Sequence, residues 1–382
     1  MIKVMTVFGT RPEAIKMAPV VLELKKHPEQ IQTVVAVTAQ HRQMLDQVLE
    51  LFQIHPDYDL NIMSQSQTLY DITTRALQGL KTVMELEKPD LVLVHGDTTT
   101  TFAGALAAYY QQIPVGHVEA GLRTGNIYSP FPEEMNRKLT GAISSIHFSP
   151  TPTAQGNLLR EGVNPDNIYV TGNTVIDALM KTVNDEYDFT AEGLEDVDFK
   201  NHRIILLTTH RRENLGEPMR HIYKALRQIV EEIKDTEVVF PVHRNPLVRK
   251  VVEEELAGVG RIHLIDPMEY EPFANLMHHS CLVLTDSGGI QEEAPSLGKP
   301  VLVLRDTTER PEAVDAGTVH LIGTDYDKVY KETKELLTNE GAYAAMSNAV
   351  NPYGDGQASR RIVQAILYAF AGATEKPDEF NV

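Results

Sequence analysis

Cysteine is almost absent from this sequence, since Cys281 is the single example among 382 residues. One thiol excludes an internal disulfide bond and any zinc site built from several cysteines. Long apolar runs are also missing, because no stretch approaches the ~18 residues that a membrane-spanning helix needs. The first residues, Ile2–Phe8, have the pattern of a strand and not that of a basic and then apolar secretory leader. We therefore expect a cytoplasmic protein with no membrane partner.

Positive charge is scarce, since 35 Lys and Arg residues stand against 53 Asp and Glu residues, for a formal net charge of −18. This acidic balance argues against nucleic acid as a partner. An anionic small ligand would therefore need a local cluster of basic groups. The sequence also lacks a G-x-x-x-x-G-K-[ST] loop, and no G-x-G-x-x-G turn follows its first strand. Neither a P-loop ATPase nor a typical dinucleotide enzyme fits these absences.

Apolar strand-like runs alternate with helical periodicity along almost the whole chain, which is typical of parallel βαβ units. We expect strands at residues 3–8, 33–38, 91–95, 115–119, 146–149, 168–170, 204–209, 237–242, 262–264, 281–285, 301–304 and 318–322. The acidic stretch 184–202 breaks this rhythm. Because single cores stop growing at about 250–300 residues, we expect an α/β protein with two Rossmann-like doubly wound domains rather than one large sheet.

The expected domain boundaries follow from the same rhythm. We expect a first domain over residues 1–175, a linker over 176–202, a second domain over 203–358, an amphipathic closing helix over 359–372 and a disordered polar tail over 373–382. Ligands in open α/β sheets bind at the carboxyl ends of the strands. The residues that directly follow each strand are therefore the candidates for function.

The turn formed by Ser287, Gly288 and Gly289 joins an expected strand to a short helix over about residues 290–297. Two glycines allow a ligand to approach the backbone closely, and the free N–H groups of a first helical turn bind anions, most often phosphate. Glu293 could accept a hydrogen bond from a sugar hydroxyl. The alternative is a connection that binds nothing, because a short glycine motif alone is a weak signal.

Basic residues follow other strands of the same half. His210 and Arg211 follow one strand, His243 follows a second and Arg305 follows a third. Three basic loops and a glycine turn at one sheet edge indicate a site for a phosphorylated ligand, and we interpret this half as the holder of a nucleoside diphosphate. Phe273 could stack on a base or belong to the core.

The first half carries carboxylates at equivalent positions. Asp97 and Glu119 come at strand ends, and Glu133 belongs to a third acidic cluster, although Asp97 could instead cap the next helix. Crowded like charges are costly unless they bind a cation or transfer protons. We favour proton transfer over a divalent metal, because the spaced ligands of a metal site are missing. Arg11 and Lys16 bracket a helix start, either to meet a dianion or as solvated surface charges.

Seven blocks in this order resemble those of the bacterial non-hydrolysing UDP-N-acetylglucosamine 2-epimerases: Phe8–Glu13, His95–Thr98, His117–Arg123, Pro132–Arg137, Thr209–Asn214, Asp286–Glu293 and Arg305–Pro311. The resemblance continues to residue 356 and so covers both expected domains. It implies a GT-B-like architecture, with two domains facing a central cleft, and reversible interconversion of UDP-GlcNAc and UDP-ManNAc without metal or other cofactor. In this family a base removes the C2 proton as UDP leaves C1, and UDP then adds back to a 2-acetamidoglucal.

Position by position, the resemblance implies catalytic roles for Asp97, Glu119, Glu133 and His210, and a UDP site formed by Arg11, Lys16, Arg211, His243, Phe273, Ser287, Gly288, Gly289 and Glu293. It also implies a homodimer with UDP-GlcNAc as substrate and as allosteric activator near Gln40, Gln43 and Arg75. The product would supply ManNAc for bacterial cell-surface polysaccharide. A GT-B glycosyltransferase, a hydrolysing 2-epimerase and a non-catalytic UDP-sugar sensor are the alternatives, and three acids favour the epimerase over a transferase, which usually needs one base.

Overall fold

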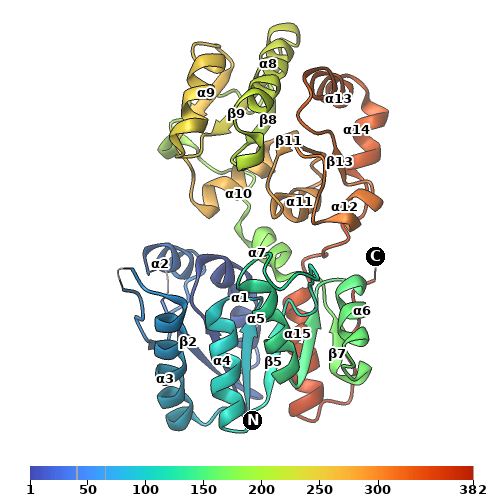
Figure 1. Ribbon diagram of the computed structural model, residues 1–382. Helices are drawn as coiled ribbons and strands as arrows, with labels where there is room; N and C mark the ends of the chain where they lie inside the picture. The colour runs from blue at the N-terminus through green and yellow to red at the C-terminus, as the bar shows by residue number, and fades with distance from the viewer. Residues whose placement is uncertain (40–41, 65, 382) are drawn as a thin grey trace. The chain divides into compact units, whose positions relative to one another are not determined.

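The computed structural model describes residues 1–39, 42–64 and 66–381, which form two compact units (Figure 1). The first unit comprises Met1–Ala178 together with Tyr353–Asn381, and the second comprises Leu179–Pro352. Each unit is an open parallel sheet covered by helices, so the expectation of two doubly wound α/β domains is confirmed.

Among the described residues, the first unit contains a seven-stranded sheet in the order β3-β2-β1-β4-β5-β6-β7. Its strands are β1 (Ile2–Phe8), β2 (Ile31–Val37), β3 (Tyr58–Asp59), β4 (Leu91–His95), β5 (Val115–Val118), β6 (Ile146–Ser149) and β7 (Ile168–Val170). Its helices are α1 (Arg11–Leu24), α2 (Arg42–Leu51), α3 (Leu69–Glu87), α4 (Thr99–Tyr110), α5 (Glu133–Ile143), α6 (Pro152–Arg160), α7 (Thr174–Thr182), which runs on into the second unit, and α15 (Ala358–Phe370).

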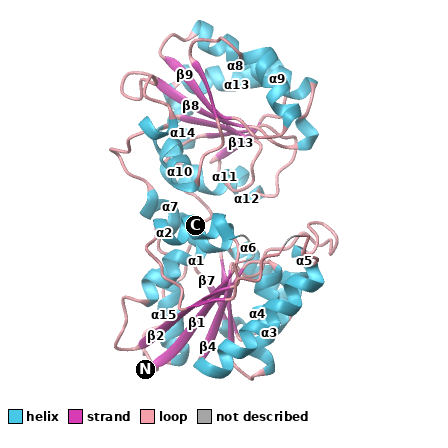
Figure 2. Ribbon diagram, turned by 90° about the vertical axis from the view of Figure 1, so that its left-hand side faces the viewer, coloured by secondary structure: helices cyan, strands magenta, loops and turns pink. Residues whose placement is uncertain are grey.

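Helices cover both faces of this sheet. In Figure 2, α1 and α15 lie on one face, whereas α3 and α4 lie on the other. The central strand β4 has the sequence LVLVH and is buried along its whole length. A continuous apolar run is what a parallel strand buried on both faces requires, which explains why the strands were predictable.

The second unit contains, within the described part of the chain, a six-stranded parallel sheet in the order β10-β9-β8-β11-β12-β13. Its strands are β8 (Arg203–Thr208), β9 (Thr236–Pro241), β10 (Ile262–Ile265), β11 (Leu282–Thr285), β12 (Val301–Val303) and β13 (Val319–Leu321). Its helices are α8 (Glu217–Glu232), α9 (Pro246–Leu256), α10 (Tyr270–His279), α11 (Ile290–Glu293), α12 (Pro311–Asp315), α13 (Tyr326–Thr338) and α14 (Glu340–Ser347).

All the expected strands are present, and their ends differ from the expected ends by no more than two residues. The sequence pattern missed β3, which has only two residues, Tyr58 and Asp59, at the edge of the first sheet. Such a short segment has too few residues to show an alternation. The expected helix over 290–297 is present as α11 followed by a 3₁₀ turn, Ala294–Leu297.

The expected domain boundaries need correction. Residues 179–202, expected to lie within a linker, pack with the second unit, and the chain returns to the first unit at Tyr353 rather than after residue 358. Packing of an aromatic side chain explains the first difference, because Phe189 is buried and meets His279 of α10 edge-on at 5.6 Å between ring centroids. A backbone hydrogen bond explains the second, because the Asn173 amide donates to the Tyr353 carbonyl at 2.7 Å.

The expected disordered tail over 373–382 is also wrong for the part that the structure describes. The Phe380 side chain is buried, and its amide donates a hydrogen bond of 2.8 Å to the Val170 carbonyl of β7. Asp378 pairs with Arg360 at 2.8 Å. One aromatic anchor and one ion pair therefore order a segment whose composition alone is polar.

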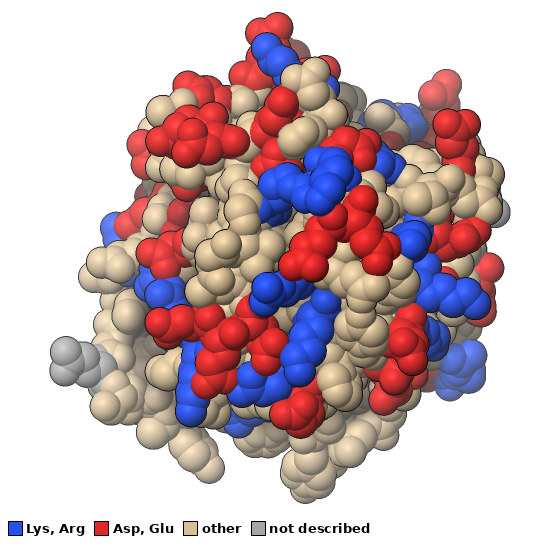
Figure 3. All heavy atoms as spheres, turned by 90° about the horizontal axis from the view of Figure 1, so that it is seen from above, with Lys and Arg blue, Asp and Glu red and all other residues tan. Residues whose placement is uncertain are grey.

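Surface charges of both signs are mixed on the face shown in Figure 3. On the outer helices of the second unit, Arg220 of α8 pairs with Glu255 of α9 at 2.6 Å, and Lys334 of α13 pairs with Glu232 of α8 at 2.8 Å. These acidic side chains therefore have basic partners on the neighbouring helix. No helix among the described residues is long and apolar enough to span a bilayer.

Candidate active site

Three predicted site residues of the first unit lie at one edge of its sheet. Strands β1, β4 and β5 are parallel neighbours, so their carboxyl ends lie next to one another. Arg11 begins α1 directly after β1, Asp97 follows β4, and Glu119 follows β5. The strand order reverses between β1 and β4, which is where open α/β sheets bind their ligands. Thr98 caps α4 through its hydroxyl, so the capping alternative for Asp97 is wrong.

Glu119 has an unusual backbone and a buried carboxylate. Its φ of 62° lies in the left-handed region, which costs a non-glycine residue about 1–2 kcal/mol. The carboxylate pairs with Lys16 and lies 3.5 Å from His95 Nε2. Burial alone would raise the pKa of Glu119, but Lys16 and His95 hold that pKa well below its usual range. Glu119 is therefore an ionised carboxylate in a strained turn, and such strain is common at active sites.

Asp97 has its own cation. Its carboxylate lies 2.5 Å from Arg137 of α5, and Asn136 donates a hydrogen bond of 2.9 Å to its carbonyl. The predicted crowding of unpaired carboxylates is thus relieved, because Asp97 and Glu119 pair with different cations. Lys16, predicted to meet the UDP, is the partner of Glu119.

The first turn of α5 contains two adjacent glutamates with different surroundings. Glu134 is fully buried and accepts hydrogen bonds of 3.1 Å from the amides of Thr124 and Gly125. Glu133, the predicted catalytic residue, is only half-buried. Glu134 therefore holds the preceding loop in place, and Glu133 has the more accessible carboxylate.

His117 of β5 holds the turn that carries Asp97. Its Nε2 lies 2.7 Å from the Gly96 carbonyl, and its ring is buried. Burial lowers the pKa of His117 to about 3. A neutral ring that donates from Nε2 therefore fixes the turn, in which Gly96 has the left-handed φ of 67° that favours glycine.

We expect the first unit to lose stability as the pH falls below about 6.5, because two buried imidazoles stay neutral in it. Burial lowers the pKa of His117 to about 3 and that of His147, on β6, to about 4. Histidine in an unfolded chain titrates near 6.5, so below that pH the unfolded state binds protons that the folded state does not. From pH 7 to pH 5 the loss is about 2 kcal/mol for each ring.

Hydrogen exchange of the β5 and β6 amides, corrected for the intrinsic effect of pH, measures this loss. His147→Leu should lose about 2 kcal/mol less than the wild type between pH 7 and pH 5. Equal losses in the two proteins would contradict the assignment of a neutral buried ring.

Asp286 organises the equivalent edge of the second unit. It follows β11, is fully buried, and accepts hydrogen bonds of 2.9 Å from the amides of both His210 and Arg211, which follow β8. His210 Nδ1 lies 2.9 Å from the same carboxylate, and Asn214 donates to it at 3.3 Å. Burial would raise the pKa of Asp286, but the hydrogen bond from His210 contributes to holding it below its usual range.

Asp286 thereby joins the two strand ends at which this sheet reverses its order, β8 and β11. Sequence reasoning alone does not single it out, although its position directly after a buried strand is the available signal. His243, which follows β9, stacks its ring on that of His210 at 5.9 Å between centroids. The predicted meeting of His210, Arg211 and His243 at one edge is therefore present.

The glycine turn lies at the same edge but does not need glycine for its backbone angles. Gly289 has a φ of −64°, which any residue adopts, and a Cβ on it would contact nothing within 4 Å. Ser287 donates its amide to Thr285 Oγ1 at 2.9 Å and accepts from Gln291 at its carbonyl. The glycines therefore leave the backbone accessible instead of permitting an unusual turn.

The remaining predicted residues are more scattered. Glu293 ends α11, and Phe273 is half-buried in α10. Gln43 is exposed on α2, and Arg75 of α3 donates to Ser64 Oγ at 2.6 Å. Gln40 lies outside the described residues.

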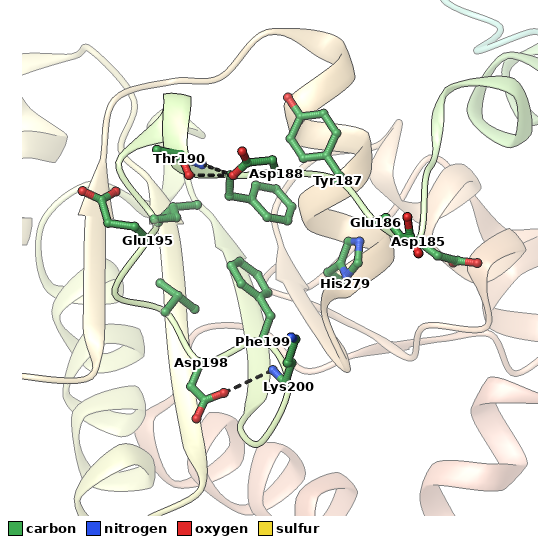
Figure 4. A pocket seen from close by; sticks show the side chains of 13 residues that line it. Asp185, Glu186, Tyr187, Asp188, Thr190, Glu195, Asp198, Phe199, Lys200 and His279 are labelled. Atoms are coloured by element: carbon green, nitrogen blue, oxygen red, sulfur yellow. Dashed lines mark hydrogen bonds between the residues drawn. The ribbon is translucent and has the colours of Figure 1, made fainter.

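A cavity of about 770 Å³ in the second unit lies elsewhere (Figure 4). Its lining is acidic and aromatic and comes from residues 185–200 together with His279. Figure 4 shows Phe199 and His279 among the side chains that line it, and the Asp198 carboxylate accepts a hydrogen bond of 3.3 Å from the Lys200 amide. No predicted site residue lines this cavity, and its carboxylates would repel a diphosphate. Within the described chain, no cluster of His, Cys, Asp and Glu fits a metal ion.

Comparison with known proteins assigns the chain to a family. The sequence profile of the UDP-N-acetylglucosamine 2-epimerase family matches residues 22–367. The UDP-N-acetylglucosamine 2-epimerase of Bacillus subtilis (strain 168) is 61% identical over 380 residues, which cover 100% of this chain and 99% of that protein.

Two solved structures agree with this match. A crystal structure of a UDP-N-acetylglucosamine 2-epimerase has a TM-score of 0.94 at 58% identity and covers 100% of this chain and 99% of its own. The Neisseria meningitidis UDP-GlcNAc 2-epimerase, crystallised bound to UDP-GlcNAc, has a TM-score of 0.83 at 54% identity and covers 96% of this chain and 100% of its own. The chain therefore belongs to the UDP-N-acetylglucosamine 2-epimerase family.

Proposed function

We propose that this protein is a non-hydrolysing epimerase that interconverts UDP-GlcNAc and UDP-ManNAc by eliminating UDP and adding it back. The observation that carries the proposal is the pair of carboxylates, Asp97 and Glu119, at neighbouring strand ends of the first unit, each beside its own cation. The carboxyl edge of the second unit supports the proposal, because His210 is hydrogen-bonded to Asp286 there, next to the turn at Ser287. Such an edge could bind a diphosphate leaving group.

The chemistry divides between these two sets of residues. A base removes the proton from C2 while the bond from C1 to the UDP oxygen breaks, which gives 2-acetamidoglucal and UDP. UDP then attacks C1, and an acid returns a proton to the opposite face of C2. Asp97, Glu119 and Glu133 are the proposed proton-transfer groups, and His210 is proposed to act near the leaving pyrophosphate. General acid–base catalysis of this kind contributes typically 10²–10⁴-fold in rate.

The proposed UDP site consists of backbone and cationic groups at the carboxyl edge of the second unit. Gly288 and Gly289 would meet the phosphates with their amides and Ser287 with its hydroxyl, with Arg211 and His243 beside them, and Phe273 would stack on the uracil. Glu293 would accept a hydrogen bond from the ribose. An N–H-rich turn and nearby cations are what a phosphate requires in an otherwise acidic protein.

Incubation of the purified protein with UDP-GlcNAc, followed by anion-exchange chromatography and mass spectrometry, tests the reaction. We expect UDP-ManNAc to appear at the expense of UDP-GlcNAc, with no net release of UDP. Free ManNAc with stoichiometric UDP would instead identify a hydrolysing epimerase. Turnover that requires an added sugar acceptor would identify a glycosyltransferase, and binding with no turnover would identify a sensor.

We also propose that UDP-GlcNAc activates the enzyme at a second site that includes Gln40, Gln43 and Arg75. The protein would work as a cytoplasmic homodimer and supply ManNAc for cell-surface polysaccharide. With UDP-ManNAc as sole substrate, turnover should begin only after a trace of UDP-GlcNAc is added. Immediate turnover without a lag would contradict the activator site.

A further inference from the structure

The glycine turn of the second unit has a carboxylate beside it. A Cβ placed on Gly288 would lie 3.9 Å from Glu309 Oε2, and no other atom outside the turn comes within 4 Å of that position. The other oxygen of Glu309 lies 3.8 Å from Arg305 Nη2. One carboxylate oxygen of Glu309 thus faces the turn, and the other faces the guanidinium of Arg305.

The loop that carries Glu309 is anchored on both sides of it. Thr308 Oγ1 donates to Gln291 Oε1 of α11 at 2.6 Å, and Arg310 pairs with Glu292 of the same helix. These contacts hold the backbone of residue 309 beside the turn. The Glu309 side chain itself is 58% exposed, so it can rotate away without breaking either anchor.

Arg305 is the opposite kind of residue. Its side chain is only 9% exposed, and its Nη1 is buried with no hydrogen-bond partner. Its Nε donates to Glu213 at 2.9 Å. Arg305 Nη1 can therefore still donate a hydrogen bond to an anion. Glu309 lies 3.8 Å from Nη2 of the same guanidinium.

We propose that Glu309 is an internal competitor of the diphosphate, a carboxylate that lies at the glycine turn in the free protein and moves away when UDP binds. The proposal rests on the assignment of this turn as the diphosphate site. A carboxylate within about 4 Å of a phosphate opposes its binding, although solvent reduces this repulsion because Glu309 is exposed. The residue would therefore set the affinity for UDP, and product release, without taking part in proton transfer.

Isothermal titration of the full chain with UDP tests this competition. Glu309→Gln should bind UDP roughly three- to tenfold more tightly than the wild type in 50 mM salt, and the difference should shrink in 500 mM salt because exposed charges are screened. Glu213→Gln is the matched control. Glu213 is 56% exposed and pairs with the same arginine, but it is not among the atoms beside Gly288. Its UDP affinity should stay within about twofold of the wild type.

The outcomes separate this inference from the proposed function. Weaker binding by Glu309→Gln would mean that Glu309 helps to hold the ligand, and unchanged binding would mean that it does not compete; either result overturns the inference. Equal tightening by both variants would show a general charge effect and would also overturn it. Failure of the wild type to bind UDP would overturn the assignment of the diphosphate site itself.

Discussion

Replacing Glu119 with Gln is expected to lower kcat by roughly three orders of magnitude, because proton transfer by a positioned carboxylate is lost. The carboxylate of Glu119 is buried, and Lys16 and His95 contribute to keeping its pKa well below the usual range. An amide at this position keeps the shape of the side chain but neither takes nor gives a proton. UDP affinity, which we assign to the second unit, should stay within about threefold of the wild type.

Steady-state kinetics with UDP-GlcNAc and titration with UDP measure the two effects separately. Glu161→Gln is the control, since Glu161 pairs with Arg123 at 2.7 Å in the same unit but lies in no predicted site. Its kcat should match that of the wild type. A Glu119→Gln enzyme with wild-type kcat would remove Glu119 from the mechanism, and a parallel loss of UDP affinity would show that its role is in binding.

Replacing Asp286 with Ala is expected to weaken UDP binding by at least tenfold and to destabilise the second unit by about 3 kcal/mol. The change removes the acceptor of the amides of His210 and Arg211, both bonded at 2.9 Å. Buried donors left without partners cost about 1–3 kcal/mol each. The loop after β8 would lose its attachment to β11, and with it the position of His210.

Hydrogen exchange of the β8 and β11 amides reports the stability of the second unit, and titration with UDP reports the affinity. Asp266→Ala is the control, because Asp266 is 78% exposed and pairs only at the surface with Arg249. It should change neither quantity measurably. If Asp286→Ala keeps both the stability and the affinity of the wild type, Asp286 does not organise this edge.

The strands and their order of appearance were predictable because parallel strands buried on both faces are continuous apolar runs. The location of the candidate site followed from the rule that ligands meet the carboxyl ends of strands, which placed Asp97, Glu119 and His210 correctly at those ends. The sequence pattern could not predict which charged side chains form ion pairs with each other. Nothing in the local pattern indicates that Lys16 pairs with Glu119 or that Arg137 pairs with Asp97, because these partners are distant along the chain.

The composition of a segment also could not predict which of its side chains are buried. Glu133 and Glu134 are adjacent and chemically identical, yet Glu134 is fully buried as a loop anchor and Glu133 is not. The acidic stretch before β8 and the polar tail each contain an aromatic residue, Phe189 and Phe380, that is buried in the folded chain. Such contacts depend on the folded chain, and a local sequence average does not record them.

Proton NMR of UDP-GlcNAc incubated with the protein in D₂O tests the central claim most directly, because elimination and re-addition must exchange the hydrogen at C2. We predict UDP-ManNAc with deuterium at C2, followed by deuterium at C2 of the remaining UDP-GlcNAc as the reaction reverses. Conversion to UDP-ManNAc that retains the original hydrogen at C2 would contradict the mechanism, and an unchanged spectrum would contradict the assignment of the activity.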